Sequence, residues 1–528
     1  MKKLFPLLSL VFLLPQMNFA QETYAEDIAP IIYKNCSTCH RQGEIGPLSL
    51  TNYEEVANWG DMIKLVTESK YMPPWQPDPN VSSFIGETIL TDTEINQIAE
   101  WVDNGKERGD IALEPSFPDF PEGSLLGEPD LVLEMKEAHL HKGNNRDSYY
   151  YFVLPTGLTQ DRIVKSMEFR PGNAKIVHHA LIFEDVNGIA ASTDAQTSEY
   201  GFESFGSFNG DQNSIDFLYE KQYPAYAPGQ KPLRYPEGLG QVLTAGADLA
   251  VQVHYAPSSS DEMDQSKINI FFADENEAPV DRFVDQRLFL PFELPGGFNS
   301  FFISAGDVKD FTGSWTVPSD ISLMGTFPHM HLLGKEWEVW VDHTDGSRTD
   351  LISIPDWDFN WQAVYYFDRL IKAEQGAVIR ARATYDNSSS NPSNPNNPPE
   401  FTLWGEGTED EMYYIPFLYV PYQQGDEDIL FTTSTDEIIR DVKNQIFPIS
   451  PNPVNDYVNA SFKIETGTTL SIAVYDISGN IIKHIRQGEY FHNGMHTVNF
   501  KTNEMPSGMY ILSIKGKAIN TSQKFVKQ

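Results

Sequence analysis

Short runs in which apolar and polar residues alternate dominate the chain after about residue 125. Turns rich in Gly, Pro, Asp and Asn separate these runs, examples of which are YYYFVLP, IVHHALIF, LAVQVHYAP, EWEVWVDH and AVIRARATYD. The pattern is typical of β-strands, and the repeated turn signals favour β-sandwich domains. We therefore expect a multidomain, mainly β protein.

Two helical patterns lie near the N-terminus. The stretch YAEDIAPIIYKN reads as a short amphipathic helix. Further on, LTDTEINQIAEWVDNGKERGD carries a capping box of Thr91 and Glu94, one apolar face, and Gly105 as a stop signal. These patterns predict a small α-helical domain at the front of the chain.

The first 20 residues have the pattern of a secretory signal peptide. Two lysines precede an apolar run from Leu4 to Leu14, and a short polar stretch ends in the small residue Ala20. The run is too short to span a bilayer, and no later stretch is long enough. We expect residues 1–20 to be removed and the rest to lie outside the cytoplasm, with no integral membrane segment.

The net charge of the chain limits the kinds of molecule that it can bind. The 528 residues include 38 Lys and Arg against 74 Asp and Glu, for a formal net charge of −36. Such a surface repels nucleic acid and anionic membranes, so we expect no nucleic-acid partner. The length fits about three or four domains of ~100–150 residues.

The only two cysteines, Cys36 and Cys39, stand with His40 in the motif CSTCH. A thioredoxin-like redox site needs a βαβ context, but a helical pattern precedes the motif. A structural zinc site needs further cysteines or a histidine pair at finger spacing, which the sequence does not offer. In the third kind of site, C-x-x-C-H, both sulfurs bond to a c-type haem and the histidine ligates its iron. The motif favours one covalently bound haem.

The second axial ligand that we expect is Met72, in the Pro-stiffened loop YMPPW. A thioether ligand raises the potential of a haem iron. The alternative is that Met72 is an ordinary packing residue. The order of helix, CxxCH, methionine loop and helix over residues 21 to about 112 resembles a small class I-like cytochrome c domain, to which we assign residues 21–124.

Five further histidines stand in strand-like runs. His329 and His331, in FPHMHLLGKEW, share one face of a strand and can converge on one metal. His254 lies on the more polar side of its strand. His178 and His179 are adjacent, so both can bind one metal only if the chain bends there. For any single histidine, a hydrogen-bonded structural role is the alternative.

Four motifs, IVHHALIF, QVHYAP, HMHLLGKE and WGEGTEDEM, occur in an order that resembles copper type II, ascorbate-dependent monooxygenases. That family includes the peptidylglycine α-hydroxylating and dopamine β-monooxygenases. The resemblance covers about residues 128–425. It implies two consecutive jelly-roll β-sandwiches, residues 125–284 and 285–425, with one copper each and a solvent cleft between them.

The resemblance also implies the copper ligands. The electron-transferring copper would be held by His178, His179 and His254. The oxygen-activating copper would be held by His329, His331 and Met412. Two imidazoles with a thioether favour Cu(I), the state that binds O₂.

Three features depart from the family. Phe327 stands where an arginine of the peptide enzymes helps to hold the substrate carboxylate, and Tyr414 and Pro416 replace an asparagine and a tyrosine. The disulfides of the animal enzymes are absent, so packing alone must hold the fold. A glycine-extended peptide is therefore not the expected substrate, whereas the copper ligands are all present.

The C-terminal segment, PNPVNDYV … SGMYILSIKG, resembles a type IX secretion sorting domain, to which we assign residues 445–528 after a linker at 426–444. We expect it to fold as a C-terminal Ig-like β-sandwich. The resemblance implies export through the periplasm and the type IX secretion machinery to the medium or the cell surface. The alternative is an ordinary adhesive β-sandwich. We expect no metal on His484, His492 or His496, and we read the pair His139 and His141 as a polar turn before a strand.

Taken together, the resemblances imply a secreted copper monooxygenase that hydroxylates a C–H bond of a small organic or peptide-like substrate with O₂. An ascorbate-like reductant or a redox protein would supply electrons. The haem would pass them to the copper of His178, His179 and His254, because covalent fusion gives the donor a high effective concentration. The alternative is a non-enzymatic surface protein that carries electrons through haem or binds a ligand, with vestigial copper sites.

Overall fold

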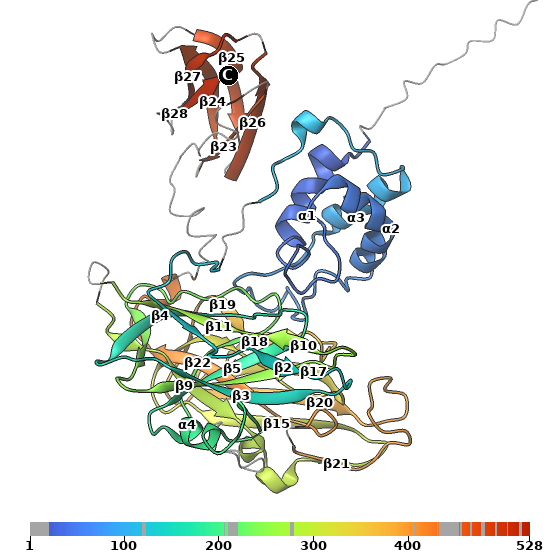
Figure 1. Ribbon diagram of the computed structural model, residues 1–528, viewed down its shortest axis with the longest axis vertical. Coiled ribbons are helices and arrows are strands. Elements are labelled where there is room, and N and C mark those ends of the chain that lie inside the picture. Colours follow the sequence, from blue (N-terminus) through green and yellow to red (C-terminus); the bar gives the residue numbers. More distant parts are fainter. Residues whose placement is uncertain are drawn as a thin grey trace, which may run out of the picture.

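The computed structural model is mainly β and is built from several modules (Figure 1). It describes residues 21–118, 123–204, 206–209, 220–274, 279–405, 407–429, 431, 454, 457–464, 467–476, 481–491, 494–503, 505–516 and 520–527. The predicted signal peptide lies outside these ranges, as does most of the predicted linker. In the described residues helices are few and strands form several sheets, which confirms the mainly β, multidomain class.

The N-terminal module is helical. Its elements are the helical turns Tyr24–Ile28 and Ile111–Leu113 and the helices α1 (Ala29–Asn35), α2 (Tyr53–Glu68) and α3 (Asp92–Asp103). The Thr91 hydroxyl accepts from the N–H of Glu94, and the Glu94 carboxylate accepts from the N–H of Thr91, which confirms the predicted capping box. Ile32, Val56 and Ile98 bring all three helices into one apolar core.

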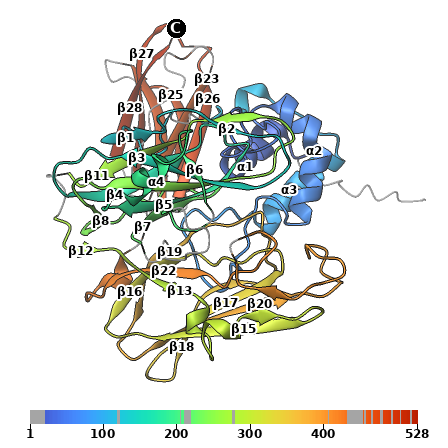
Figure 2. The same cartoon turned by 60° about the horizontal axis from the view of Figure 1, so that its bottom comes forward.

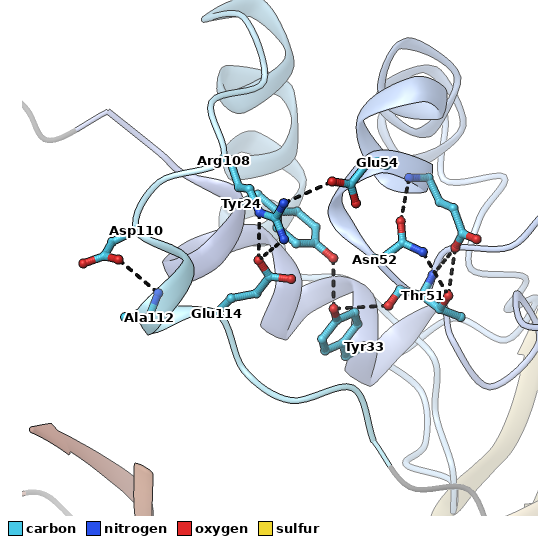
Figure 3. Close-up of polar contacts among 10 residues, drawn as sticks. Tyr24, Tyr33, Thr51, Asn52, Glu54, Arg108, Asp110, Ala112 and Glu114 are labelled. Carbon is cyan, nitrogen blue, oxygen red and sulfur yellow. Dashed lines mark hydrogen bonds and ion pairs between the residues drawn. The ribbon is translucent and has the colours of Figure 1, made fainter. Parts of the chain in front are cut away.

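Hydrogen bonds join the first and last segments of this module (Figure 3). The Tyr24 hydroxyl donates to the Tyr33 hydroxyl at 3.1 Å, and Tyr33 donates to a backbone carbonyl at 3.3 Å. The Arg108 guanidinium binds Glu54 and Glu114, both at 3.0 Å. These contacts close the module, and Cys36 and Cys39 form no disulfide.

The chain between α2 and α3 leaves the helical module and packs on a neighbouring sandwich. We call residues 75–88 the strap. The N–H of Ile85 donates to the carbonyl of Tyr366 at 2.8 Å, and Phe84 forms an antiparallel bridge with Phe367. The ring of Phe84 is 5% exposed and belongs to the core of that sandwich. The helical module is therefore attached to this neighbouring sandwich through residues 75–88 of its own chain.

The first sandwich has two five-stranded sheets, in the orders β1-β11-β4-β8-β12 and β6-β3-β9-β5-β7. Its elements are β1 (Leu131–Glu134), β2 (His139–His141), β3 (Ser148–Pro155), β4 (Arg162–Arg170), β5 (Val177–Asp185), α4 (Ile189–Asp194), β6 (Phe202–Glu203), β7 (Gln222–Tyr226), β8 (Leu239–Leu243), β9 (Asp248–Tyr255), β10 (Glu262–Asp264), β11 (Lys267–Phe272) and β12 (Arg282–Phe283). Inward residues of both sheets, such as Phe152, Ile182 and Ile268, form one core.

His139 and His141 lie on strand β2, so the interpretation of this pair as a polar turn was wrong. Strand β2 pairs antiparallel with β10. The ring of Tyr255 stacks on His139 at 5.1 Å and on His141 at 5.4 Å. Both nitrogens of His141 are within hydrogen-bond distance of Ser148 Oγ and the Ala256 carbonyl. Ring stacking and strand pairing therefore fix these histidines in a structural role.

The second sandwich has two four-stranded sheets, β13-β22-β16-β19 and β15-β20-β17-β18, and a small sheet of β14 and β21. Its elements are β13 (Asp285–Phe289), the turns Pro291–Glu293 and Phe298–Ser300, β14 (Phe302–Ile303), β15 (Val308–Thr316), β16 (Ile321–Thr326), β17 (Gly334–Asp342), β18 (Arg348–Ile354), β19 (Tyr365–Ala373), β20 (Val378–Asp386), β21 (Thr402–Leu403) and β22 (Ile415–Pro421). Its core includes Trp337, Ile379 and Phe417.

The two sandwiches lie next to one another (Figure 2). One apolar cluster joins Tyr151 and Phe183 of the first to Leu290, Met412 and Tyr414 of the second. Because this cluster contains an expected copper ligand, the contact between the sandwiches helps to build the site.

A buried ion pair joins the end of the first sandwich to residues beyond the second. Arg282 Nη1 lies 2.8 Å from both carboxylate oxygens of Asp426, and the two side chains are 8% and 3% exposed. The Ser322 hydroxyl donates to Asp426 at 2.6 Å, and Phe431 is buried nearby. The described start of the predicted linker, including the turn Asp426–Asp428, is therefore packed on the sandwiches and is not an extended connection.

The C-terminal module is a small β-sandwich of strands β23 (Tyr457–Ile464), β24 (Thr468–Asp476), β25 (Ile481–Phe491), β26 (Gly494–Lys501), β27 (Gly508–Gly516) and β28 (Asn520–Lys527). Its sheets have the orders β23-β26 and β25-β24-β27-β28 and enclose their own core. Across the part of the chain that the structure describes, no helix has the length and apolar character needed to cross a membrane.

Candidate metal centres

Three histidines from two neighbouring strands of the first sandwich converge on one point. We call His178, His179 and His254 the three-histidine set. Their Nδ1 atoms lie 3.2 Å (His178 to His179), 3.2 Å (His178 to His254) and 3.3 Å (His179 to His254) apart. Among the described residues, this is the only group of three or more His, Cys, Asp or Glu side chains whose ligand atoms all lie within 4.8 Å of one another. Such a spacing suits one metal ion bound by three imidazoles.

A bulge allows the adjacent residues His178 and His179 to point to one place. Strand β5 pairs antiparallel with β9, and the register shifts between Val177 and His179, so that His179 lies opposite His254. A regular strand would send neighbouring side chains to opposite faces, and an extra residue in a bulge redirects one of them. The bend that the sequence required for shared metal binding is present.

Asp147 and Tyr149 hold His254 in place. The Nε2–H of His254 donates to Asp147 Oδ1 at 2.7 Å, which leaves Nδ1 for the convergent point. The ring of Tyr149 stacks on the imidazole at 4.1 Å with an interplanar angle of 8°. A carboxylate behind a ligand histidine fixes its tautomer and orientation.

The three imidazoles are neutral at physiological pH. Burial, followed by the neighbouring imidazoles, holds the pKa of His179 and that of His254 well below the usual value. Burial also lowers the pKa of His178. Since a metal binds the deprotonated ring, these shifts favour metal binding.

The second sandwich holds the other predicted ligands, which we call the mixed set: His329, His331 and Met412. The two imidazole centroids lie 5.0 Å apart, and their planes are nearly perpendicular. The N–H of His329 donates to the carbonyl of Tyr414 at 2.9 Å, which brings the segment of Met412 alongside the histidines. Met412 is 7% exposed. The set therefore offers two imidazoles and a buried thioether.

Hydrogen bonds select the free nitrogen of each imidazole in the mixed set. The Nδ1–H of His329 donates to Gln362 Oε1 at 2.6 Å, and the Nδ1–H of His331 donates to the carbonyl of Asp410 at 3.1 Å. Nε2 is thus the nitrogen left for a metal. Burial lowers the pKa of His329 to about 3 and that of His331 to about 4, so both rings are neutral.

Glu411 joins the two segments of the mixed set. Its buried carboxyl group accepts the N–H groups of His331 at 3.0 Å, Leu333 at 2.6 Å and Met412 at 3.2 Å. Burial raises the pKa of this carboxyl to about 8, although these donors act in the opposite direction. Sequence reasoning missed Glu411, and its position directly before the expected ligand Met412 was the one available signal.

The two sets share a neighbour in the loop between β18 and β19. The ring of Phe359 lies 6.1 Å from that of His178 and 5.9 Å from that of His331. The imidazoles of the mixed set also contribute to the lowered pKa of His179 and of His254. Sequence reasoning gave no role to this loop, because its contacts form only when the sandwiches meet.

The CSTCH motif follows α1 in the helical module. His40 Nδ1 lies 3.1 Å from the carbonyl of Leu48, which leaves Nε2 free. Burial raises the pKa of Cys36 to about 12 and also raises that of Cys39. A dithiol redox site relies on a low thiol pKa, and these cysteines lack it. Met72 follows α2, with its N–H donating to the carbonyl of Val66 at 3.0 Å.

Comparison with known proteins identifies the tail. The family model of the secretion system C-terminal sorting domain matches residues 448–528, which confirms the prediction for this segment. No curated protein matches the chain.

Among solved structures, the β-glucuronidase of Faecalibacterium prausnitzii is similar at 13% identity over 42% of this chain and 37% of that one, with a TM-score of 0.12. The major capsid protein P2 of bacteriophage PM2 is similar at 11% identity over 56% of this chain and 99% of that one, with a TM-score of 0.22. The VP2 particle of infectious bursal disease virus gives 9% identity, 59% and 76% coverage and a TM-score of 0.16.

The chain thus spans little more than a third of the length of the β-glucuronidase, and scores this low carry no conclusion about fold or activity. The family match of the C-terminal segment does support a conclusion. Because residues 448–528 match a sorting domain of the secretion system, the protein is secreted or displayed on the cell surface.

Proposed function

We propose that this protein is a secreted copper-dependent monooxygenase that hydroxylates a C–H bond of a small organic or peptide-like substrate. The observation that carries the proposal is the convergence of the Nδ1 atoms of His178, His179 and His254 within 3.3 Å of one another, next to a second donor set of different composition. Jelly-roll topology for the two sandwiches remains part of the proposal.

The donor atoms fit copper. Three neutral imidazoles suit a copper ion that changes between Cu(II) and Cu(I), and two imidazoles with the thioether of Met412 favour Cu(I). Bound copper would supply electron transfer at the three-histidine set and activation of O₂ at the mixed set. In the overall reaction one oxygen atom enters the substrate and the other leaves as water, so two electrons and two protons must come from an external donor such as an ascorbate-like reductant or a redox protein.

The surrounding residues orient the donor atoms and keep protons at defined places. Asp147 keeps a proton on Nε2 of His254, and Gln362 keeps one on Nδ1 of His329. Around the mixed set, the rings of Phe327 and Tyr414 each lie 5.9 Å from His329. These aromatic neighbours favour a substrate that presents an apolar or aromatic group over one that needs an arginine for its carboxylate.

The helical module would hold the electron carrier. Cys36 and Cys39 would bond to the vinyl groups of one c-type haem, His40 would ligate the iron through Nε2, and Met72 would be the second axial ligand. The hydrogen bond from His40 Nδ1 to the Leu48 carbonyl supports this assignment, because it fixes the ring with Nε2 free.

Metal analysis of the mature protein tests the proposal. After copper loading and removal of loosely bound metal, we expect one iron and two coppers per chain, with substrate-dependent oxygen consumption in a screen of C–H substrates. His179→Ala and His331→Ala should each lose one copper. His343→Ala is the matched control, because His343 is bound to Glu374 and Thr349 away from both sets and should leave both coppers in place.

One iron with no tightly bound copper would contradict the proposal. That result would leave a surface cytochrome that carries electrons or binds a ligand.

A further inference from the structure

The loop that would carry the haem is in direct contact with the first sandwich. A Cβ atom placed on Gly229 would lie 3.4 Å from Cys39 Sγ, which is ordinary van der Waals contact. Gly229 has φ +79°, a left-handed conformation that favours glycine. The backbone of the segment after β7 therefore passes close to one of the two sulfurs that would attach the haem, with room for no more than a methyl group between them.

A cluster of charges fixes this contact. Glu44 follows the CSTCH motif and binds Arg41 of its own loop at 2.7 Å. The same carboxylate oxygen lies 3.6 Å from Nη2 of Arg170, the last residue of β4 in the first sandwich. All three side chains are less than a quarter exposed, so the pairs are only partly screened by solvent.

Tyr226 lies on the first-sandwich side of this contact, three positions before Gly229. It is the last residue of β7, and its ring packs on Phe169 at 5.2 Å. Burial, followed by the charge of Glu44, raises the pKa of its hydroxyl. The Tyr226 side chain is therefore within electrostatic range of Glu44 in the loop after the CSTCH motif.

Strand β7 leads from this contact to the three-histidine set. It pairs antiparallel with β5, and Tyr226 lies opposite Ala180, the neighbour of His179 in the chain. The path from Cys39 to His179 thus crosses the gap between Cys39 and Gly229, follows the chain from Gly229 to Tyr226, and crosses one strand pair to Ala180.

We propose that the segment Tyr226–Gly229 is the electron entry of the copper module and delivers electrons from the haem to the three-histidine set. This inference rests on the proposed function. With both groups bound, each transfer would oxidise one ferrous haem to the ferric state and reduce one Cu(II) to Cu(I). Two transfers serve one hydroxylation, and an external one-electron donor of the ascorbate type reduces the haem again each time.

A second path leads from the same loop toward the mixed set. Gln230 Oε1 accepts the N–H of Val364 at 3.3 Å, and Gln362, two residues earlier, binds His329. This path runs through side-chain hydrogen bonds, whereas the path to His179 runs through a strand pair. We therefore assign electron entry to the three-histidine set. Electron transfer to the mixed set instead is one of the outcomes that the experiment can detect, and it would contradict this assignment.

The experiment follows one electron in the full secreted protein, loaded with haem and Cu(II). The haem is reduced, oxygen is excluded, and oxidation of the haem is followed by stopped-flow absorbance while loss of the Cu(II) signal is followed by electron paramagnetic resonance. Gly229→Leu extends a side chain toward Cys39. Gly229→Ala is the matched control, because it imposes the same backbone strain but only an ordinary contact.

We expect Gly229→Leu to slow haem oxidation about tenfold, since a small displacement at a reacting contact has a large effect on rate. Gly229→Ala should remain close to the parent rate. Glu44→Gln, which removes the ion pair without touching the glycine, should also slow the transfer. Lys175→Gln, which breaks an exposed ion pair of the same sandwich, should not. The haem spectrum and the copper content of each variant check that both centres are intact.

The acceptor is tested separately. His179→Ala should abolish rapid haem oxidation, whereas His331→Ala should leave it unchanged. The opposite pattern would overturn the inference and assign entry to the mixed set. Parent-like rates in both Gly229→Leu and Glu44→Gln would also overturn it, while ascorbate-driven hydroxylation by the same variants would leave the proposed function standing. A chain that binds no copper tightly would overturn both.

Discussion

Asp147 Oδ1 and His254 Nε2 lie 2.7 Å apart, although the two residues are 107 positions apart in the chain. His254 is 1% exposed, and Asp147 is the acceptor for its Nε2–H. The carboxylate holds the imidazole in the tautomer that presents Nδ1 to His178 and His179. The pair therefore connects the fold of the first sandwich to the chemistry of its candidate metal site.

Removal of this carboxylate should weaken metal binding. We expect Asp147→Ala to lower copper affinity at the three-histidine set by about 10–100-fold, because the ligand loses its orienting partner. Copper titration followed by electron paramagnetic resonance measures the change. Glu374→Ala is the matched control, because Glu374 has the same 2.7 Å contact with His343. Equal losses in the two variants would contradict a specific role for Asp147.

Removal of the Gln362 side chain should weaken metal binding at the mixed set in the same way. Its Oε1 accepts from His329, and its Nε2 donates to the carbonyl of Phe359 at 2.7 Å, so it anchors both the ligand and the loop. We expect Gln362→Ala to lower affinity at this set by about 10–100-fold and to leave the three-histidine set unchanged. At limiting copper the chain should then retain one ion. Gln375→Ala, at an exposed position, should retain two.

The ion pair of Arg282 and Asp426 should make a large contribution to stability. Asp426→Ala would leave a buried guanidinium without its partner, and breaking a buried pair in this way costs about 3–5 kcal/mol. Calorimetry of the full chain should show a lower unfolding temperature for the sandwiches. Asp428→Ala, two residues away and exposed, should have little effect. An unchanged transition in Asp426→Ala would mean that residues beyond 425 do not stabilise the sandwiches.

His139 should make the first sandwich sensitive to acid. Burial, followed by the charge of His141, lowers the pKa of His139 to about 4. A lowered pKa means that the folded state favours the neutral imidazole over the protonated one. The contribution of the neutral ring to stability is therefore complete above about pH 6.5 and is lost as the pH falls through about 4. We expect His139→Gln to reduce the loss of unfolding free energy between these two pH values. An identical pH dependence in parent and variant would contradict the assignment.

Local sequence patterns predict much of the architecture. Alternation of apolar and polar residues produces strands wherever a sheet buries one face, and the capping box of Thr91 and Glu94 needs only four consecutive residues. The tail motif likewise sufficed to identify the sorting domain. Local patterns failed at His139 and His141, because stacking on Tyr255 involves residues more than 100 positions away.

The features of the candidate site likewise fall into those that the sequence predicts and those that only the tertiary structure decides. The sequence by itself determined which imidazoles and which thioether are available, and it stated the condition that His178 and His179 could share a metal only if the chain bends. Tertiary structure alone decided that a bulge opposite His254 supplies the bend, that Asp147 and Gln362 select the free nitrogens, and that Phe359 adjoins both sets. The physical reason is separation: periodicity reports which face a residue occupies, whereas ligand geometry depends on contacts between strands and loops that only the packed sandwiches bring together.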